Sequence, residues 1–373
     1  MTVQSQAERG LEDATGKVVL VTGAAGFIGS HVARYCAEEL GMAVVAVDDL
    51  SGGYLSNVPE IDSVAFVRGD IKDAVFLGEL FGRFSFDFVY HLAAYPAIGI
   101  SHFIRSYNYR NNFVASTEII NAIMKSHHKV DCFIFTSSNG KLQLEETVPQ
   151  PEDPYGISKY STELDIKAAH KTWGLDSVIL RLHNVYGPNQ NMKDIYRNAI
   201  AIFMHEVMSG DLITIFGDDT QTRQFTYITD VTPIIAKAPL IRAARNQVIN
   251  VGSDKSYSIN ELAHYILTLM GEDKTRIKHV EARQEVQHAS VKDHSKLRSL
   301  FGPSTPVELK EGLRLLVESL KQKDIAKNSA TMIDSVEVLD QMPPIWVTPD
   351  LTQKEKVELQ GPPINETYKE RSK

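Results

Sequence analysis

The chain has 373 residues, of which 43% are hydrophobic and 23% are charged, and its formal net charge is −8. This length suffices for one large domain or two ordinary ones, and the composition excludes a wholly disordered or fibrous chain. The acidic balance argues against a general binder of nucleic acid or of an anionic membrane surface. A local basic site for a phosphorylated ligand is still compatible with it.

The chain has two cysteines, Cys36 and Cys132. They allow at most one disulfide and no cysteine zinc site, so we expect a reducing compartment, the cytoplasm, and no metal centre. The first sixteen residues are polar and acidic, unlike a signal peptide. The sequence has no run of about 18 apolar residues, and we therefore expect no membrane span.

Short apolar runs alternate with helical patterns through the first half of the chain. Buried strands are predicted at residues 17–22, 42–47, 64–67, 86–91 and 132–136, and a helix is predicted at residues 30–40. This alternation predicts an α/β fold of the Rossmann type, a doubly wound parallel sheet with helices on both faces and right-handed crossovers.

Beyond about residue 185 the alternation loosens. A helix is expected at residues 195–208, a strand at 212–216, and further helices from a Ser258-Ile-Asn-Glu261 capping box toward Met270 and at 306–322. We predict a Rossmann domain at 17–185 with a return segment near 224–252. A smaller α/β substrate-binding domain is predicted at 186–223 and 253–325, and a tail with little structure of its own at 326–373.

The strongest local signal is Gly23-Ala-Ala-Gly26-Phe-Ile-Gly29, between the first predicted strand and the first predicted helix. In that context the first glycine permits a tight turn, the second admits a pyrophosphate close to the backbone, and the third lets helix and strand pack closely. The free N–H groups of the helix N-terminus face the phosphates. The alternative is a glycine-rich connection without a ligand.

Acidic residues follow the second and third predicted strands. Asp48 ends the second strand, 19 residues after Gly29, where a carboxylate accepts both ribose hydroxyls of NAD and repels the 2′-phosphate of NADP. The next residue is Asp49 rather than arginine, which also favours NAD. Asp70 is placed to meet the adenine amino group. Each of these residues has the alternative of an ordinary turn acid.

The second signal is Tyr155-Gly-Ile-Ser-Lys159, after the fifth predicted strand. Residues four apart share one helix face, and a nearby ammonium favours the phenolate of a tyrosine whose ordinary pKa is about 10. Such a phenolate is a base for a sugar hydroxyl. Thr136-Ser137-Ser138 ends the fifth strand and offers a hydroxyl to the same oxygen. A surface tyrosine beside a lysine, and a helix-capping serine, are the alternatives.

With these motifs the chain resembles the extended short-chain dehydrogenase/reductase family, and within it the NAD-dependent epimerases and dehydratases of nucleotide sugars. The resemblance covers roughly residues 17 to 325. It rests on motifs that occur in the family's order: the glycine motif, His91-Leu-Ala-Ala94, Tyr155 with Lys159, Arg181-Leu-His-Asn-Val-Tyr-Gly-Pro188, and Gly217-Asp-Asp-Thr-Gln-Thr-Arg-Gln-Phe-Thr-Tyr-Ile-Thr-Asp230. The nearest relatives it implies are UDP-glucose 4-epimerases.

The resemblance implies roles for individual residues. The catalytic set is Ser138, Tyr155 and Lys159. The cofactor-binding set is Gly23, Gly26, Phe27, Ile28, Gly29, Asp48, Asp49, Asp70, Ile71, Leu92, Ala93, Ala94, Asn112, Tyr155 and Lys159. The substrate-binding set is Asn184, Asn198, Arg223 and Arg283. The arginines suit a diphosphate because guanidinium groups make charge-assisted contacts with it. A solvated surface charge is the alternative for each arginine.

One departure from the family pattern lies after the serine pair. Ser137-Ser138 continues into Asn139-Gly140, no Val-Tyr-Gly follows, and Ser138 precedes Tyr155 by only 17 residues. The family's 4,6-dehydratases usually carry an Asp-Glu pair at that place, so a dehydratase is disfavoured. The shorter connection also leaves a non-catalytic NAD-binding protein as an alternative.

The sequence therefore predicts an NAD-dependent nucleotide-sugar epimerase that acts at C4 of a UDP-hexose through a transient 4-keto sugar. A decarboxylase or a reductase of another nucleotide sugar fits the same motifs. The resemblance further implies a homodimer.

Overall fold

A computed structural model describes residues 11–138, 149–192, 194, 196, 198–217, 221–281, 293–322, 336–343 and 346. Its largest element is a parallel sheet, seven-stranded in the described part of the chain, with the order β10-β6-β5-β4-β1-β2-β3. The strands are β1 (Val18–Thr22), β2 (Ala43–Asp48), β3 (Val64–Arg68), β4 (Phe88–His91), β5 (Cys132–Ser138), β6 (Ser177–Leu182) and β10 (Gln247–Val251). The order changes direction at β1, beside which a doubly wound sheet binds its ligand.

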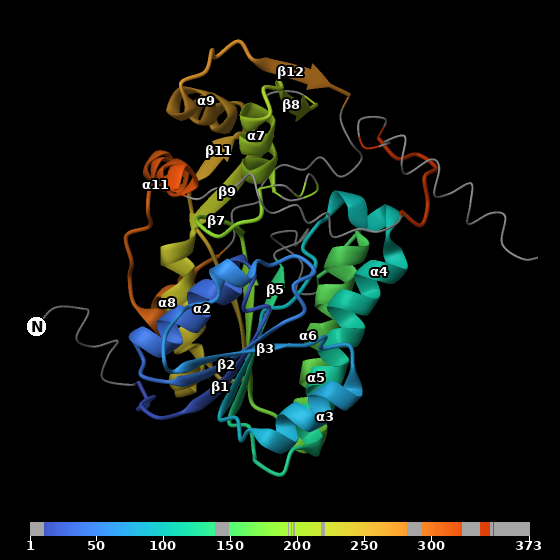
Figure 1. Ribbon diagram of the computed structural model, residues 1–373, viewed down its shortest axis with the longest axis vertical. Coiled ribbons are helices and arrows are strands. Elements are labelled where there is room, and N and C mark those ends of the chain that lie inside the picture. Colours follow the sequence, from blue (N-terminus) through green and yellow to red (C-terminus); the bar gives the residue numbers. More distant parts are fainter. Residues whose placement is uncertain are drawn as a thin grey trace, which may run out of the picture.

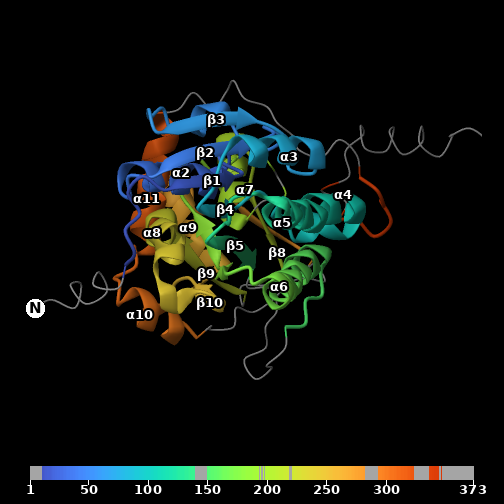
Figure 2. The same cartoon turned by 90° about the horizontal axis from the view of Figure 1, so that it is seen from below.

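Helices cover both faces of this sheet, as the alternating pattern predicts. On one face lie α2 (Phe27–Glu38) and α8 (Ile228–Lys237), and on the other lie α3 (Ala74–Arg83), α5 (Ala115–Lys125) and α6 (Pro154–Trp173), as Figures 1 and 2 show. Strand residues Val19, Val21 and Val44 are buried toward α2, whereas Leu20 and Val45 are buried toward α3 and α5. The sheet is thus apolar on both sides, which explains the continuous apolar runs of its strands.

A second group of elements, here called the upper group, lies above the carboxyl ends of the main strands (Figure 1). It comprises β7 (Asn184–Tyr186), α7 (Ala199–Met208), β8 (Ile213–Phe216), β9 (Thr222–Tyr227), β11 (Ser256–Ser258), α9 (Ile259–Met270), β12 (Ile277–Val280) and α11 (Leu309–Gln322). Strands β11, β9 and β7 form one small sheet, and β12 pairs with β8 in another. The short helix α10 (Ser295–Phe301) packs near β10.

Predicted and observed bounds differ mainly at helix starts. Helix α2 begins at Phe27 instead of residue 30, because the glycine motif itself supplies the first helical turn. Helix α7 begins at Ala199 instead of residue 195, because the Asn198 side chain accepts a hydrogen bond from the N–H of Ala201 and caps the helix. The predicted capping box of Ser258 and Glu261 is confirmed.

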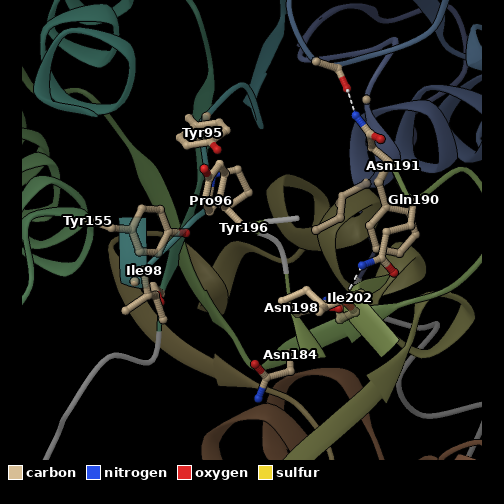
Figure 3. A pocket seen from close by; sticks show the side chains of 18 of the residues that line it. Tyr95, Pro96, Ile98, Tyr155, Asn184, Gln190, Asn191, Tyr196, Asn198 and Ile202 are labelled. Carbon is tan, nitrogen blue, oxygen red and sulfur yellow. Dashed lines mark hydrogen bonds between the residues drawn. The ribbon is translucent and has the colours of Figure 1, made fainter. Parts of the chain in front are cut away.

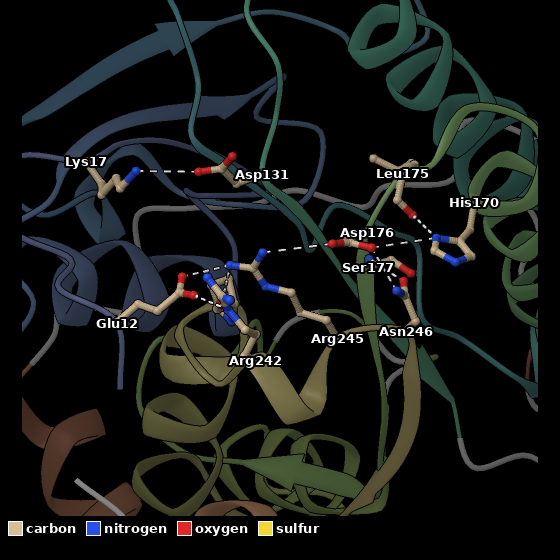
Figure 4. A network of polar contacts seen from close by, with 11 residues as sticks. Glu12, Lys17, Asp131, His170, Leu175, Asp176, Ser177, Arg242, Arg245 and Asn246 are labelled. Atoms are coloured by element: carbon tan, nitrogen blue, oxygen red, sulfur yellow. Dashed lines mark hydrogen bonds and ion pairs between the residues drawn. The ribbon is translucent and has the colours of Figure 1, made fainter. Parts of the chain in front are cut away.

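The amino ends of the main strands are held by ion pairs, away from the ligand edge (Figure 4). Glu12 contacts Arg242 at 3.0 Å and Arg245 at 2.8 Å, and Lys17 contacts Asp87 at 2.9 Å and Asp131 at 3.5 Å. These side chains are partly exposed, so each pair contributes at most about 1 kcal/mol. Together they tie the segment before β1 to the sheet.

Part of the segment expected to have little structure of its own packs against the rest of the chain. Val336, Met342 and Trp346 are buried in a cluster with Ile100 and Ile104. These described residues form no helix or strand of their own, and their apolar side chains pack on neighbours that come from distant parts of the sequence, so the expectation at 326–373 stays a prediction. Among the described residues, no helix is long and apolar enough to span a bilayer.

Candidate active site

A cavity of about 830 Å³ opens between the carboxyl ends of the main strands and the upper group. Its wall runs from the glycine motif, past Tyr155, to residues of β8 and β9. Cavities of this size and place hold small ligands in doubly wound folds.

The glycine motif forms one end of the cavity and fits a dinucleotide. Gly23 has φ +72°, and a Cβ there would lie 2.8 Å from the backbone of Ala93. A Cβ on Gly29 would lie 2.0 Å from the carbonyl oxygen of Gly23, so neither position tolerates a side chain without movement. Gly26 precedes α2 and provides no side-chain cap, which leaves the helix N-terminus open toward a phosphate.

Asp48 lies at the carboxyl end of β2, beside the glycine motif. Its carboxylate accepts hydrogen bonds from the N–H groups of Ala25 at 3.0 Å and Leu50 at 2.8 Å, and burial raises its pKa. Each carboxylate oxygen keeps a further lone pair for a ribose hydroxyl. Nearby, Lys72 lies 3.1 Å from Asp70 and 4.0 Å from Asp49, so these two acids form a charged rim.

Replacing Asp48 with asparagine is expected to weaken NAD binding about tenfold, because the charge-assisted contact with the ribose is lost. NADP binding should be unchanged or stronger, because the carboxylate that repels its 2′-phosphate is also gone. The measurement is calorimetric titration of both nucleotides. Asp62→Asn, an exposed acid outside the cavity, is the control. An unchanged ratio of the two affinities would contradict the role of Asp48.

Tyr155 and Lys159 come from the first turns of α6, which begins at Pro154 with Asp153 as its cap. In Figure 3 the Tyr155 ring points into the cavity beside Ile98. The Nζ of Lys159 donates to the carbonyl oxygen of Thr136 at 2.9 Å and lies 6.0 Å from the centre of the Tyr155 ring. The spacing of four residues therefore places both side chains on the cavity wall.

The serine pair at the end of β5 divides into two environments. Ser137 donates to the buried carboxylate of Glu163 at 2.6 Å, and Glu163 also accepts two hydrogen bonds from Arg181. Ser138 lines the same cavity as Tyr155 and is half-buried. The shortened connection that follows Ser138 falls on residues 139–148, outside the described residues.

A buried polar network lies under the predicted nicotinamide groove at Leu92, Ala93 and Ala94, which line the cavity. His91 contacts Thr22 at 2.8 Å and Ser116 at 2.9 Å, and burial, with the nearby Lys159 charge, lowers its pKa to about 3. The imidazole is therefore neutral and holds β4 against β1.

Asn112 lies behind the cavity wall and does not line it. Its side chain accepts from the N–H of Tyr95 at 2.7 Å and donates to the Tyr95 carbonyl at 3.1 Å. Both ends of the amide are thus engaged by the loop after β4, which is a supporting position. A direct contact of Asn112 with the cofactor stays a prediction.

Asn184, Asn198 and Arg223 line the upper side of the cavity. The Asn184 amide donates to the Gln224 carbonyl at 2.9 Å, and the Asn198 amide caps α7 and accepts from Gln190 at 2.9 Å. Arg223 lies on β9 and donates to the Thr222 carbonyl at 2.8 Å. Arg283 falls outside the described residues.

Several lining residues carried no sequence signal. They are Tyr95, Pro96, Ile98, Gln190, Asn191, Tyr196, Ile202, Phe216, Lys278 and Trp346. Tyr196 belongs to one buried apolar cluster with Tyr95, from which it is far removed in the sequence, and both residues are labelled at the cavity in Figure 3. Most of these residues belong to loops, where no periodic pattern of apolar residues marks the buried side. Only the motifs next to them in the sequence indicated that this part of the chain lies near the site.

Lys159 is expected to give the nucleotide-free protein a distinctive pH dependence. Burial lowers its pKa from 10.5 to about 7. Between about pH 7 and 10.5 the unfolded chain therefore binds a proton that the native chain does not, and the free energy of unfolding rises with pH by up to about 1.4 kcal/mol per unit. Urea denaturation from pH 7 to 10 should show this rise in the wild type and lose it in Lys159→Met.

The matched control for this experiment is Lys167→Met, because Lys167 lies on the same helix with an exposed ammonium. It should keep the wild-type slope of stability against pH. A Lys159→Met variant with the same slope as the wild type would show that burial of this ammonium does not govern the dependence.

Fold and cavity together define a dinucleotide-binding protein with a polar second compartment. A model of the "NAD dependent epimerase/dehydratase family" matches residues 19–252. A putative UDP-glucose 4-epimerase of Methanocaldococcus jannaschii is 33% identical over 317 residues, which are 82% of this chain and 99% of that protein.

Solved structures agree with this match. The UDP-glucose 4-epimerase of Thermotoga maritima with UDP-glucose superimposes with a TM-score of 0.74 at 31% identity, covering 82% of this chain and 99% of that one. The Thermus thermophilus UDP-glucose 4-epimerase with NAD has a TM-score of 0.73 at 28% identity, with the same coverage. This chain belongs to the NAD dependent epimerase/dehydratase family; it is an enzyme, and its cofactor is NAD.

Proposed function

We propose that this enzyme is a nucleotide-sugar 4-epimerase that acts on a UDP-hexose. The observation that carries the proposal is that one cavity is lined by the glycine motif, by Tyr155 and Lys159, and by Arg223. A dinucleotide at one end and a diphosphate at the other leave the sugar beside the Tyr155 hydroxyl.

Tyr155 is the group that moves the proton. As a phenolate it removes the proton of the C4 hydroxyl, and as a phenol it returns one to the C4 oxygen of the product. A phenolate on Tyr155 and an ammonium on Lys159 favour each other, because opposite charges lie close together in a buried site. NAD, when bound, supplies the acceptor and donor of the hydrogen at C4.

Ser138 is proposed to donate a hydrogen bond to the same C4 oxygen. Its place at the end of β5 is supported by its neighbour Ser137, which the Glu163 carboxylate holds at 2.6 Å. The cofactor would be held by the glycine motif at its pyrophosphate and by Asp48 at its adenosine ribose, as the cradle and the carboxylate geometry favour.

The upper side of the cavity is proposed to hold the diphosphate. Arg223 supplies the positive charge, and the N-terminus of α7, capped by Asn198, lies on the same wall. A fixed diphosphate lets the 4-keto sugar turn about its bond to the phosphate and present its other face without leaving the site. Position and charge, rather than a further reactive group, are what the protein contributes.

The test is an NMR assay of purified protein with UDP-glucose, UDP-galactose and their uronic-acid and N-acetyl counterparts, first without added cofactor and then with NAD⁺. Interconversion at C4 is the expected result and identifies the sugar. A 4-keto-6-deoxy product would instead identify a 4,6-dehydratase, and loss of carbon dioxide from a uronic acid would identify a decarboxylase.

No change in any of these sugars, with NAD bound to the protein, would overturn the proposed reaction.

Analytical sedimentation of the same protein tests whether it forms the homodimer that the family resemblance implies. The cytoplasmic location stays a prediction.

A further inference from the structure

Three aromatic side chains from separate segments meet on the upper side of the cavity. Tyr196 precedes α7, Phe216 ends β8, and Trp346 belongs to the C-terminal segment that comprises the described residues 336–343 and 346. The indole ring centre lies 5.4 Å from the Tyr196 ring centre, nearly perpendicular to it, and 6.4 Å from the Phe216 ring centre. All three side chains line the cavity.

The C-terminal segment is attached to the helices that flank the main sheet. The carboxylate of Glu337 accepts from the N–H groups of Ser106 at 2.8 Å and Tyr107 at 2.7 Å, at the start of α4 (Arg105–Tyr109). The N–H of Glu337 also donates to the carbonyl of Phe103 at 2.8 Å. Figure 1 shows the described part of the segment above α4.

Trp346 therefore connects the two sides of the cleft. Its ring packs edge-on against Phe103 at 6.4 Å on one side and reaches Phe216 on the other, and only 6% of the residue is exposed. Trp346 lies in no described helix or strand, so these ring contacts hold it at the cavity.

The proposed positions of the substrate's parts indicate what this wall meets. With the sugar at Tyr155 and the diphosphate at Arg223, the wall on the small sheets is left for the nucleoside. That region is formed by β8 and β12, with Phe216 and Lys278, and by Trp346. A planar base stacks on aromatic faces, whereas a phosphate is bound by charged and hydrogen-bond donating groups.

We propose that Trp346 is a substrate-binding residue that closes the nucleoside end of the cavity and, with Phe216, selects for a nucleotide-linked sugar. This inference rests on the proposed function, since it takes the second ligand to be a nucleotide sugar. The match to the Thermotoga maritima structure covers 99% of that chain but 82% of this one. This chain therefore has residues beyond the shared fold, and such a wall can come from them.

The first experiment uses the fluorescence of the protein's own tryptophans. The chain has two, Trp346 and Trp173, and Trp173 is 63% exposed at the end of α6. In Trp173→Phe the emission comes from Trp346 alone, and UDP should change it saturably. In Trp346→Phe the emission comes from Trp173, and the same titration should leave it unchanged.

The second experiment measures affinity and turnover. Trp346→Leu keeps an apolar side chain but removes the aromatic face, and it should raise the Kd of UDP and the KM of the UDP-sugar by the same factor, about tenfold. The melting temperature should fall, because Trp346 is buried among other aromatic rings. NAD affinity at the assay temperature should stay at the wild-type value, and this separation of UDP affinity from NAD affinity is what a purely structural role for the residue would not predict. Trp346→Phe should recover most of the lost UDP affinity.

The outcomes separate the two proposals. Calorimetric binding of UDP by the wild type, together with unchanged Trp346 emission and an unchanged UDP affinity in Trp346→Leu, would overturn this inference alone. Failure of the wild type to bind UDP, dTDP or GDP would overturn the proposed function, and this inference with it. Equal weakening of NAD and UDP in Trp346→Leu would show a general loss of structure and would also overturn it.

Discussion

Replacing Tyr155 with phenylalanine is expected to lower turnover of the nucleotide sugar by about a thousandfold. The change removes one hydroxyl and keeps the buried ring, so the packing of α6 against the cavity should be preserved. On the proposed mechanism the reaction then lacks the group that removes the C4 proton, whereas the proposed contacts of NAD and the diphosphate are unchanged. The measurement is single-turnover kinetics, with calorimetric titration of UDP to confirm that binding is retained.

The matched control for this prediction is Tyr160→Phe. Tyr160 lies on the same helix and does not line the cavity, so the same chemical change there should leave turnover within twofold. Turnover of Tyr155→Phe close to the wild-type rate would assign the proton transfer to another group, and Ser138 would then be the residue to replace next.

Replacing Arg181 with methionine is expected to destabilise the protein by about 3–5 kcal/mol. Arg181 on β6 donates to both oxygens of Glu163 on α6, at 2.8 and 2.6 Å, and only 1% of the Glu163 side chain is exposed. Removing the guanidinium leaves a buried carboxylate without its counter-charge. Urea denaturation monitored by circular dichroism measures the loss.

Two further variants test the physical reason. Arg34→Met breaks an exposed i,i+4 pair with Glu38 and should cost less than about 0.5 kcal/mol, because water screens that pair. The double variant Arg181→Met/Glu163→Gln should recover part of the loss, because the uncompensated charge is gone. A double variant no more stable than Arg181→Met alone would show that packing, not the buried charge, accounts for the effect.

The Glu163–Arg181 pair also shows where prediction from sequence stops. Both residues are visible in the sequence, 18 positions apart on a helix and a strand, but no local pattern relates them. They meet because β5 and β6 are neighbours, with Ser137 opposite Arg181, and α6 packs over that edge. The pair holds Ser137, and through it the end of β5, in the candidate site.

What the sequence by itself determined is the part of the site that depends on local chemistry. The turn at Gly23 needs a positive φ, Asp48 follows directly from the end of a buried strand, and Tyr155 and Lys159 share a helix face by their spacing. These constraints act over a few residues, so a motif in its strand–turn–helix context indicated the fold and NAD as cofactor before any long-range contact was known.

What only the tertiary structure decided is which distant side chains share the cavity and which way they point. Asn112 turns toward the loop at Tyr95 instead of the cavity, and Trp346 reaches Tyr196 and Phe216 from a segment with no predicted structure. Such contacts arise from the order of strands in the sheet and from the burial of apolar surface between remote segments. Neither leaves a periodic or compositional mark on the residues involved.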